Sequence, residues 1–249
     1  MIIIKTDIEI EYMRQAGKVV ANTLLKLEEA IRPGITTAEL DIIAEEYILK
    51  QGAKPSFKGY CGFPGSICTS VNNEVVHGIP SKNVVLQEGD IISVDCGAIL
   101  NGYQGDAART FYVGNTSEEA LKLIEVTKQS FFKGVEKAII GNKLTDISAA
   151  IQEYVESFGY SVVRDYVGHG IGKEMHEDPE VPNYGRPGRG PTLKKGMVLA
   201  IEPMVNIGKY NVEVERNDWT VVTVDRSLSA HYENTVAILD NGPEILTIV

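Results

Sequence analysis

Cysteine is scarce in this 249-residue sequence, and no long apolar run is present. The three cysteines, Cys61, Cys68 and Cys96, form no C-x-x-C pair, so a secreted disulfide framework is not expected. No segment has the roughly 20 consecutive apolar residues that a membrane helix needs. The segment Met1–Thr6 has no basic leader and is too short for the apolar part of a signal peptide. We therefore expect a cytoplasmic protein with no membrane partner.

Basic residues are also in deficit. The 24 Lys and Arg face 34 Asp and Glu, which gives a net charge of −10 at pH 7. This acidic balance argues against nucleic acid as a direct partner. Hydrophobic residues make up 43% of the chain, which is ordinary for a globular protein.

An internal repeat divides the chain. The pattern L-x-x-G-x-x-x-x-x-D that ends at Asp95 recurs 107 residues later as L-x-x-G-x-x-x-x-x-E, ending at Glu202. The same offset relates three further pairs of identical residues: Gly34 and Gly141, Tyr47 and Tyr154, Gly52 and Gly159. The repeat predicts a single domain over residues 1–249, built from two related halves of about 1–115 and 116–249 that share one core.

Each half is predicted to begin with two helices. Thr-x-x-Glu capping boxes stand before apolar residues spaced by three and four, and Pro or Gly follows them. The boxes begin at Thr6, Thr36 and Thr116. The first helix ends before Pro33-Gly34, the second at Gly52 and the third near Gly141, while a fourth runs from about Thr145 to Gly159.

Strands are predicted after each helix pair. The runs Ile91–Leu100 and Tyr103–Val113 flank Asn101-Gly102, a strong hairpin signal, so Asp95 and Asp106 are expected near the same level and facing one pocket. Further strands are predicted at Met197–Ile207, Trp219–Val224 and Thr235–Leu239, and a loop at Asn183–Pro191. The mixture of helices and strands indicates an α/β (α+β) fold.

Four carboxylates and one imidazole match the donor set of a two-metal hydrolase. They are Asp95, Asp106, His169, Glu202 and Glu233. For a single acid a surface position is the commoner fate, but Asp95 and Glu202 follow apolar runs, where an unpaired carboxylate would be costly. Oxygen and imidazole donors suit two divalent ions such as Mn, Fe, Co or Zn. Such a site leaves room for a bridging water of lowered pKa.

Three of the four histidines lie in glycine-containing segments. His77 and His169 open matching His-Gly-Ile tripeptides, and His176 follows soon after. A lone histidine more often has a structural role, but this grouping favours a functional one. His231 gives only a weak functional signal, although it lies two residues before Glu233.

Six segments together resemble the type I methionine aminopeptidases of the pita-bread metallopeptidase family. They are 72–80 (NNEVVHGIP), 90–97 (DIISVDCG), 105–110 (GDAART), 168–172 (GHGIG), 201–204 (IEPM) and 232–235 (YENT). The resemblance covers essentially the whole chain. It implies a pita-bread fold, in which two pseudo-twofold-related αβ halves surround a central antiparallel sheet.

The resemblance also implies roles for the conspicuous side chains. The four acids and His169 would be the metal ligands, with Asp106 and Glu233 bridging the two ions. A hydroxide between the ions would attack the first peptide bond, and Glu202 would carry the proton to the leaving amine. His77 and His176 would bind the peptide and stabilise the tetrahedral intermediate.

The family's methionine pocket corresponds to four residues here, Tyr60, Phe63, Cys68 and Trp219, and Phe57 and Met175 are expected to line the same site. Phe63 and Met175 depart from the residues that some or many relatives carry, which affects the pocket shape. The implied substrates are nascent polypeptide N-termini with a small second residue. The implied state is a monomer, with a docking site on the ribosome as an open alternative.

Three other functions were weighed. Prolidase or aminopeptidase P would share the ligands but normally carries an extra N-terminal domain, whereas the first helix here is predicted within about ten residues of Met1. A non-enzymatic relative would be expected to lose ligands, but all five positions are filled. A type II enzyme carries a helical insertion before its last ligand, and only thirty residues separate Glu202 from Glu233.

Overall fold

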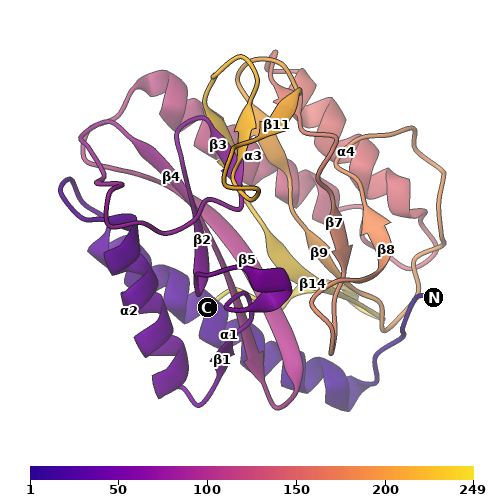
Figure 1. Cartoon of the computed structure of the whole chain (residues 1–249). Helices are drawn as coiled ribbons and strands as arrows, with labels where there is room; N and C mark the ends of the chain where they lie inside the picture. Colours follow the sequence, from indigo (N-terminus) through magenta and orange to yellow (C-terminus); the bar gives the residue numbers. More distant parts are fainter.

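The computed structural model describes all residues from Met1 to Val249. Its helices are α1 (Asp7–Ala30), α2 (Thr37–Lys50), α3 (Glu118–Val135) and α4 (Leu144–Glu156), with a short 3₁₀ turn at Tyr60–Gly62. The strands are β1 (Lys54–Pro55), β2 (Ile67–Val71), β3 (Glu74–Val76), β4 (Ile91–Leu100), β5 (Tyr103–Tyr112), β6 (Ser161–Val162), β7 (Gly168–Gly170), β8 (Glu177–Val181), β9 (Val198–Ile201), β10 (Met204–Asn206), β11 (Val212–Val214), β12 (Val221–Thr223), β13 (Ser229–His231), β14 (Asn234–Leu239) and β15 (Gly242–Ile245). Figure 1 shows their arrangement.

The first two helices begin as their capping boxes predict. The Thr6 hydroxyl accepts from the Glu9 N–H, and the Glu9 carboxylate accepts from the Thr6 N–H at 2.8 Å. Thr36 and Glu39 make the same reciprocal pair at the start of α2. Each box satisfies backbone donors that the first helical turn leaves without partners, which fixes where the helix starts.

The prediction for α3 was wrong at both ends. Ser117 rather than Thr116 caps the helix, because its hydroxyl accepts from the Ala120 N–H while Thr116 donates to the Gly89 carbonyl at 2.7 Å. The helix ends at Val135, well before Gly141, since the chain leaves it through tight turns of the i to i+3 type. The loop predicted at residues 183–191 contains no helix or strand.

The predicted strand from Met197 to Ile207 is two strands. β9 ends at Ile201 and β10 begins at Met204, with Glu202 and Pro203 between them. Proline has no N–H to donate to a ladder, so it interrupts the strand at this point. Glu202 therefore lies just after the last residue of β9, outside both strands.

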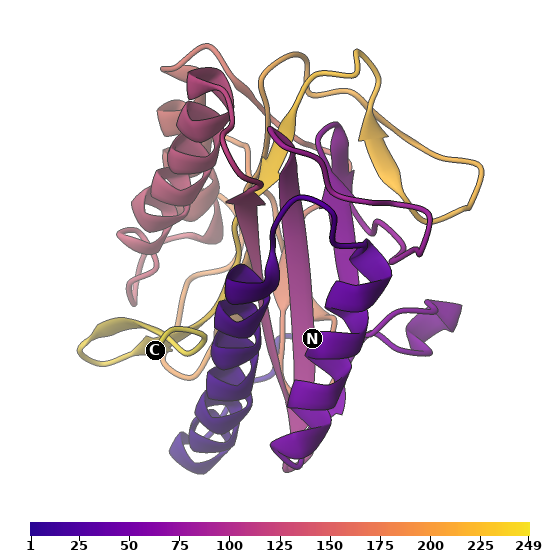
Figure 2. The ribbon, with the colours of Figure 1, turned by 90° about the vertical axis from the view of Figure 1, so that its left-hand side faces the viewer.

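Two antiparallel ladders carry most of the sheet structure. In the first half, β4 pairs with β1, β2 and β5, and the β4–β5 hairpin runs in register from Ile91 opposite Tyr112 to Leu100 opposite Tyr103. In the second half, the strand order is β15-β14-β9-β7-β8. Figure 2 shows α1 and α2 side by side on the first-half strands, where α1 packs against β4 and β5 and α2 against β1 and β2, while α3 and α4 lie apart from them, mainly on second-half strands.

Equivalent positions of the two halves make the same backbone contacts. The Gly34 N–H donates to the Leu86 carbonyl at 2.8 Å, and 107 residues later the Gly141 N–H donates to the Leu193 carbonyl at 3.0 Å. The isolated bridge between Thr36 and Val85 likewise recurs between residues 143 and 192. These matching contacts support the division into two halves, whose boundary near residue 115 stays a prediction.

The buried apolar residues also separate by half. One cluster runs from Val19 to Val113 and includes the buried faces of α1, which packs on β4 and β5, and of α2, which packs on β1 and β2. The larger cluster takes its members from residues 120–238, with only Ile91 from the first half. A smaller cluster contains residues of both halves, including Met13 and Val198. Most of the core is thus local to one half. The two halves meet where β5 contacts β14 and the residue before it, and these segments carry the predicted ligands Asp106 and Glu233.

Candidate metal centre

The β4–β5 hairpin places two carboxylates on one face. Asp95 lies opposite Ala108, and Asp106 lies opposite Gly97, two residues along in each strand. Residues two apart on a strand share a face, so the diagonal pair points the same way. The expectation that both acids face one pocket is confirmed by this register.

The second half joins this hairpin through β14 and the residue before it. The Glu233 N–H donates to the Ala108 carbonyl at 3.0 Å. The Thr235 hydroxyl donates to the Asp106 carbonyl at 2.9 Å and accepts from the Asp106 N–H at 3.0 Å. Both contacts cross between the halves, and they set Glu233 beside Asp106.

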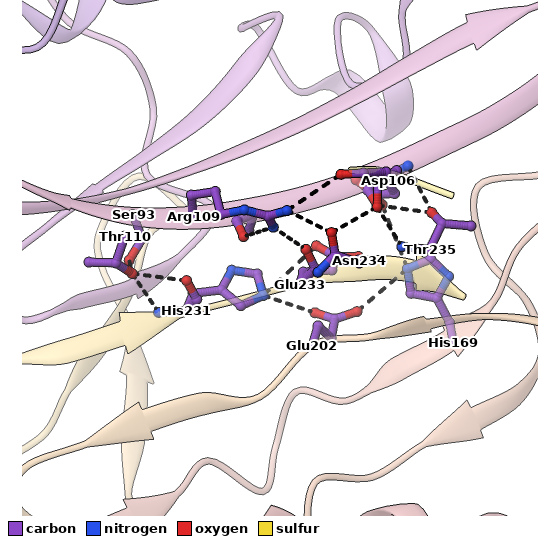
Figure 3. Close-up of polar contacts among 12 residues, drawn as sticks. Ser93, Asp106, Arg109, Thr110, His169, Glu202, His231, Glu233, Asn234 and Thr235 are labelled. Carbon is purple, nitrogen blue, oxygen red and sulfur yellow. Dashed lines mark hydrogen bonds and ion pairs between the residues drawn. The ribbon is translucent and has the colours of Figure 1, made fainter. Parts of the chain in front are cut away.

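His169 and Glu202 come from neighbouring strands. His169 on β7 lies opposite Ala200 on β9, and Glu202 follows two residues later with its side chain on the same face. The His169 Nδ1 donates to the Gly170 carbonyl at 2.9 Å, so its Nε2 lone pair points to the acids. That nitrogen lies 3.5 Å from Glu202 Oε1 and 3.8 Å from Asp106 Oδ2. Figure 3 shows these side chains directed toward one another.

The weak functional signal assigned to His231 needs correction. Its ring is buried and its Nε2 lies 3.6 Å from Glu202 Oε2 and 3.9 Å from Glu233 Oε2. The signal that could have found it was the spacing of two residues to Glu233, because alternate residues of extended chain share a face. The structure therefore places His231 in the carboxylate cluster, which the sequence analysis did not predict.

Several buried polar atoms in this cluster have no hydrogen-bond partner. They are Asp95 Oδ1, Asp106 Oδ1, Glu233 Oε1 and His231 Nε2. Buried polar atoms nearly always have a hydrogen-bond partner. Four neighbouring oxygen and nitrogen atoms without one are therefore suited to binding cations. Two groups of three residues each have their ligand atoms within 4.8 Å of one another. One group is Asp95, His231 and Glu233, and the other is Asp106, His169 and Glu233. Glu233 belongs to both sets, as a bridging ligand must.

Burial controls the charge state of the acids. It raises the pKa of Asp95 to about 7 and the pKa of Glu202 to about 8. Burial also raises the pKa of Asp106 and Glu233 well above the usual range, and the neighbouring carboxylates add to the effect. Four acids that resist ionisation together would become carboxylates if divalent ions offset their repulsion.

The imidazoles of the site are held neutral. Burial lowers the pKa of His77, His169 and His231 to about 4. A neutral imidazole keeps the lone pair that a metal ligand must offer, whereas a protonated one cannot bind an ion. The donor set of carboxylates and neutral imidazoles therefore fits two ions of intermediate hardness.

The two other predicted catalytic histidines lie outside the carboxylate cluster. His176 is exposed, its Nδ1 lies 2.8 Å from the Tyr60 hydroxyl, and its ring centre is 4.4 Å from that of His169. His77 packs edge-on against Tyr166 at 5.6 Å between ring centres and has a backbone φ of +60°. A positive φ is uncommon away from glycine, and it is a recurrent feature of functional sites.

The predicted pocket residues form two groups. Phe63 and Trp219 meet edge to face at 5.1 Å, and Cys68 lies opposite Asp95 in the pairing of β2 with β4. Phe57 and Met175 converge on Gly97, where an added Cβ would lie within 3.0 Å of both. Since Gly97 is opposite Asp106, Phe57 and Met175 lie beside the carboxylate cluster, as Cys68 does through Asp95.

A partly buried arginine holds the backbone at Glu233, a role that the sequence analysis did not assign to it. The Arg109 guanidinium donates to the Glu233 carbonyl at 2.5 Å and to Asn234 Oδ1 at 2.6 Å, and lies 4.2 Å from the centre of the Tyr232 ring. It binds the backbone and leaves the Glu233 carboxylate free. Arg109 therefore fixes the strand that presents Glu233 without competing for its oxygens.

Comparisons with known proteins were consistent over the whole chain. The model of metallopeptidase family M24 matches residues 11–240. The methionine aminopeptidase of Clostridium acetobutylicum is 78% identical over 248 residues, which is 100% of this chain and 99% of that protein. The crystal structure of the methionine aminopeptidase of Thermotoga maritima superposes with a TM-score of 0.99 at 51% identity, covering 100% of both chains. The prolidase of Pyrococcus furiosus superposes with a TM-score of 0.80 at 27% identity, covering 99% of this chain and 66% of that one.

These similarities decide the expectations drawn from sequence. The pita-bread fold is confirmed, since the metallopeptidase structures superpose over the length of the chain. None of the helices combines the length and apolar character needed to cross a membrane. The resemblance carried by six short segments is likewise confirmed, and the chain belongs to metallopeptidase family M24.

Proposed function

We propose that this chain is a type I methionine aminopeptidase, which removes the first methionine from polypeptides whose second residue is small. The observation that carries the proposal is the cluster of carboxylate and imidazole atoms that are buried without a hydrogen-bond partner, with Cys68 of the predicted methionine pocket opposite Asp95. The 78% identity to a full-length methionine aminopeptidase supports it. The substrates would be nascent chains in the cytoplasm, and the protein would act as a monomer.

We infer that Asp95, Asp106, His169, Glu202 and Glu233 hold two divalent ions, drawn from Co, Mn, Fe or Zn. Bound ions would polarise the scissile carbonyl and lower the pKa of a water molecule. We assign the proton transfer to Glu202, which follows the last residue of β9 and which has this role by the family resemblance. It would take the proton from water and deliver it to the leaving amine.

The neutral histidines outside the cluster would bind the peptide. His176, steadied by Tyr60, would donate to the peptide from the exposed side, and His77 from the side of Tyr166. Donors placed where negative charge develops stabilise a tetrahedral intermediate. The free α-amino group would reach one of the bound ions as a neutral amine, which an acetylated N-terminus cannot do.

The first side chain would enter the pocket formed by Tyr60, Phe63, Cys68 and Trp219. A slender thioether packs well against sulfur and aromatic walls. Phe57 and Met175 narrow the space at Gly97. A small second residue would be required, because the scissile bond must approach a recessed group of ligands.

The competing function is a proline-directed peptidase, favoured by the superposition on prolidase. The chain is 27% identical to that prolidase but 78% identical to the Clostridium acetobutylicum methionine aminopeptidase. The higher identity favours removal of methionine over prolidase activity.

Four peptides assayed with one metal salt distinguish these functions. Met-Ala-Ser should release free methionine, while Met-Lys-Ser, Pro-Ala-Ser and acetyl-Met-Ala-Ser should resist. Norleucine in place of methionine should be cleaved less well, since a change of one methylene in an apolar pocket is worth about 1–3 kcal/mol. Efficient cleavage of the lysine or acetylated peptide would refute the substrate geometry, and a general preference for bonds before proline would favour the alternative.

A further inference from the structure

His231 has a fully buried imidazole nitrogen in the cluster that lacks a hydrogen-bond partner. Its Nε2 is buried, and no donor or acceptor lies within hydrogen-bond distance. The two facing carboxylate oxygens, on Glu202 and Glu233, are 3.6 Å and 3.9 Å away. A direct hydrogen bond would bring them to about 3 Å. The imidazole therefore faces the acids at a distance that is too long for a hydrogen bond and that suits a shared metal ion.

His169 shows the same spacing. Its Nε2 lies 3.5 Å and 3.8 Å from carboxylate oxygens of Glu202 and Asp106. Donors that bind one ion tetrahedrally at about 2.1 Å stand roughly 3.4 Å apart. Glu202 thus has one imidazole at ligand spacing on each of its two oxygens, as Figure 3 shows.

We propose that His231 is a nitrogen ligand of the second ion, together with Asp95 and Glu233, so that each ion is bound by one imidazole. The donor atoms of these three residues lie within 4.8 Å of one another. This inference rests on the ligand assignment made under the proposed function. It adds a sixth ligand to the five residues deduced from sequence.

The backbone of His231 is fixed for such a role. Its N–H donates to the Thr110 hydroxyl at 2.8 Å, and the Thr110 hydroxyl donates to its carbonyl at 2.9 Å. Ser93 lies 2.8 Å from the same hydroxyl and can supply the remaining hydrogen bond. A ligand held by the opposite strand is already in position before the ion arrives, which favours affinity.

Adding an imidazole to the carboxylate ligands changes which ions the second site prefers. Carboxylates alone suit Mn or Mg, whereas imidazole suits Fe, Co, Ni and Zn. With one imidazole for each ion, both sites should prefer the same class of metal. The second ion should also bind more tightly than to carboxylates alone.

Cobalt titration of the metal-free protein tests the proposal without any assay of activity. Calorimetry should find two bound ions in the wild type, and the visible spectrum should change with each equivalent. In His231→Ala and His231→Gln the affinity for the second ion should fall. The loss should exceed the roughly 10–100-fold that is typical when only a hydrogen-bond partner of a ligand is removed. Glutamine keeps a hydrogen-bond donor, so its failure to restore binding separates ligation from hydrogen bonding.

His77→Ala is the matched control, because it removes an imidazole of the same pocket outside the carboxylate cluster. It should leave both cobalt affinities and the spectrum unchanged. Unaltered second-ion affinity and spectrum in His231→Gln would overturn the role of His231 while leaving the other ligands in place. A wild-type protein that binds no cobalt would overturn the ligand assignment itself.

A measurement on the wild type covers variants that fail to fold. Proton NMR of the dicobalt protein should show strongly shifted imidazole signals from two histidines. Shifted signals from a single histidine would overturn the proposal.

Discussion

At the scale of single residues, the site depends on acids that are costly without a cation. Asp106 and Glu233 are buried, each has an oxygen without a partner, and neighbouring charges oppose their ionisation. Buried acids of this kind lower the stability of a fold, so their presence points to a functional role. Mutations here should therefore affect metal binding and activity far more than folding.

We expect Asp106→Ala and His169→Ala each to abolish nearly all peptidase activity and to weaken metal binding. Each removes a donor from the set formed with Glu233. Metal content after dialysis and release of methionine from Met-Ala-Ser measure the two effects. Full activity with unchanged metal content in either variant would contradict the assignment.

His77→Ala should behave differently. Both ions should remain, while the rate falls on the order of 10²–10³-fold, as when a donor to the transition state is lost. The reason is that His77 lies beside Tyr166 and outside both groups of ligand atoms. Metal analysis beside kcat measures this, and a loss of metal would make His77 a ligand instead.

At the scale of elements, the contact between β5 and β14 determines the geometry of the site. Thr235 is fully buried and its hydroxyl satisfies both the N–H and the carbonyl of Asp106. No sequence pattern predicts this contact, because it joins residues 129 positions apart through one side chain. The strand pairing alone would leave the two halves unconnected at this point.

Thr235→Val should destabilise the protein by about 1–3 kcal/mol, since it leaves buried polar groups of Asp106 unsatisfied with little change in volume. Denaturant unfolding of the metal-free protein measures the loss. Thr116→Val is the matched control, because its hydroxyl also bonds a carbonyl but lies near the surface. Equal effects in the two variants would show that the crossing contact has no special weight.

The sequence predicted local elements well and contacts between them poorly. The Asn101-Gly102 turn and the alternation of residues sufficed for the register of Asp95 and Asp106, because a two-residue turn determines the pairing. The end of α3 was misplaced, since a glycine after a helix does not say how many tight turns precede it. His231 and Arg109 were missed because their roles arise only when β5, β13 and β14 meet.

At the scale of the whole molecule, the buried acids should make stability depend on pH. Without metal, the folded protein holds a proton on Glu202 up to a pKa of about 8, whereas the unfolded chain releases it near 4.5. The folded state then binds more protons than the unfolded state, so stability falls as pH rises through this interval. The neutral histidines, with pKa lowered to about 4 from 6.5, act in the opposite direction but only below about pH 6.5.

We therefore expect the metal-free protein to lose roughly 1–2 kcal/mol of stability between pH 6.5 and 8. Urea unfolding in the presence of a chelator at three pH values measures the slope. Glu202→Gln cannot ionise at this position and should flatten the slope. A stability that rises over this interval in the wild type would contradict the raised pKa values.

The line between the halves has a consequence for motion. The Asp106 and Glu233 amide protons both bond across it, to Thr235 Oγ1 and the Ala108 carbonyl. Ligands from both sides would tie the halves together when ions bind, whereas the metal-free protein lacks these ties. Local opening should then begin along this line, so hydrogen exchange at these two amides should slow markedly when metal is added. Amides in the middle of α2 and α4, each packed within one half, should exchange at the same rate with and without metal.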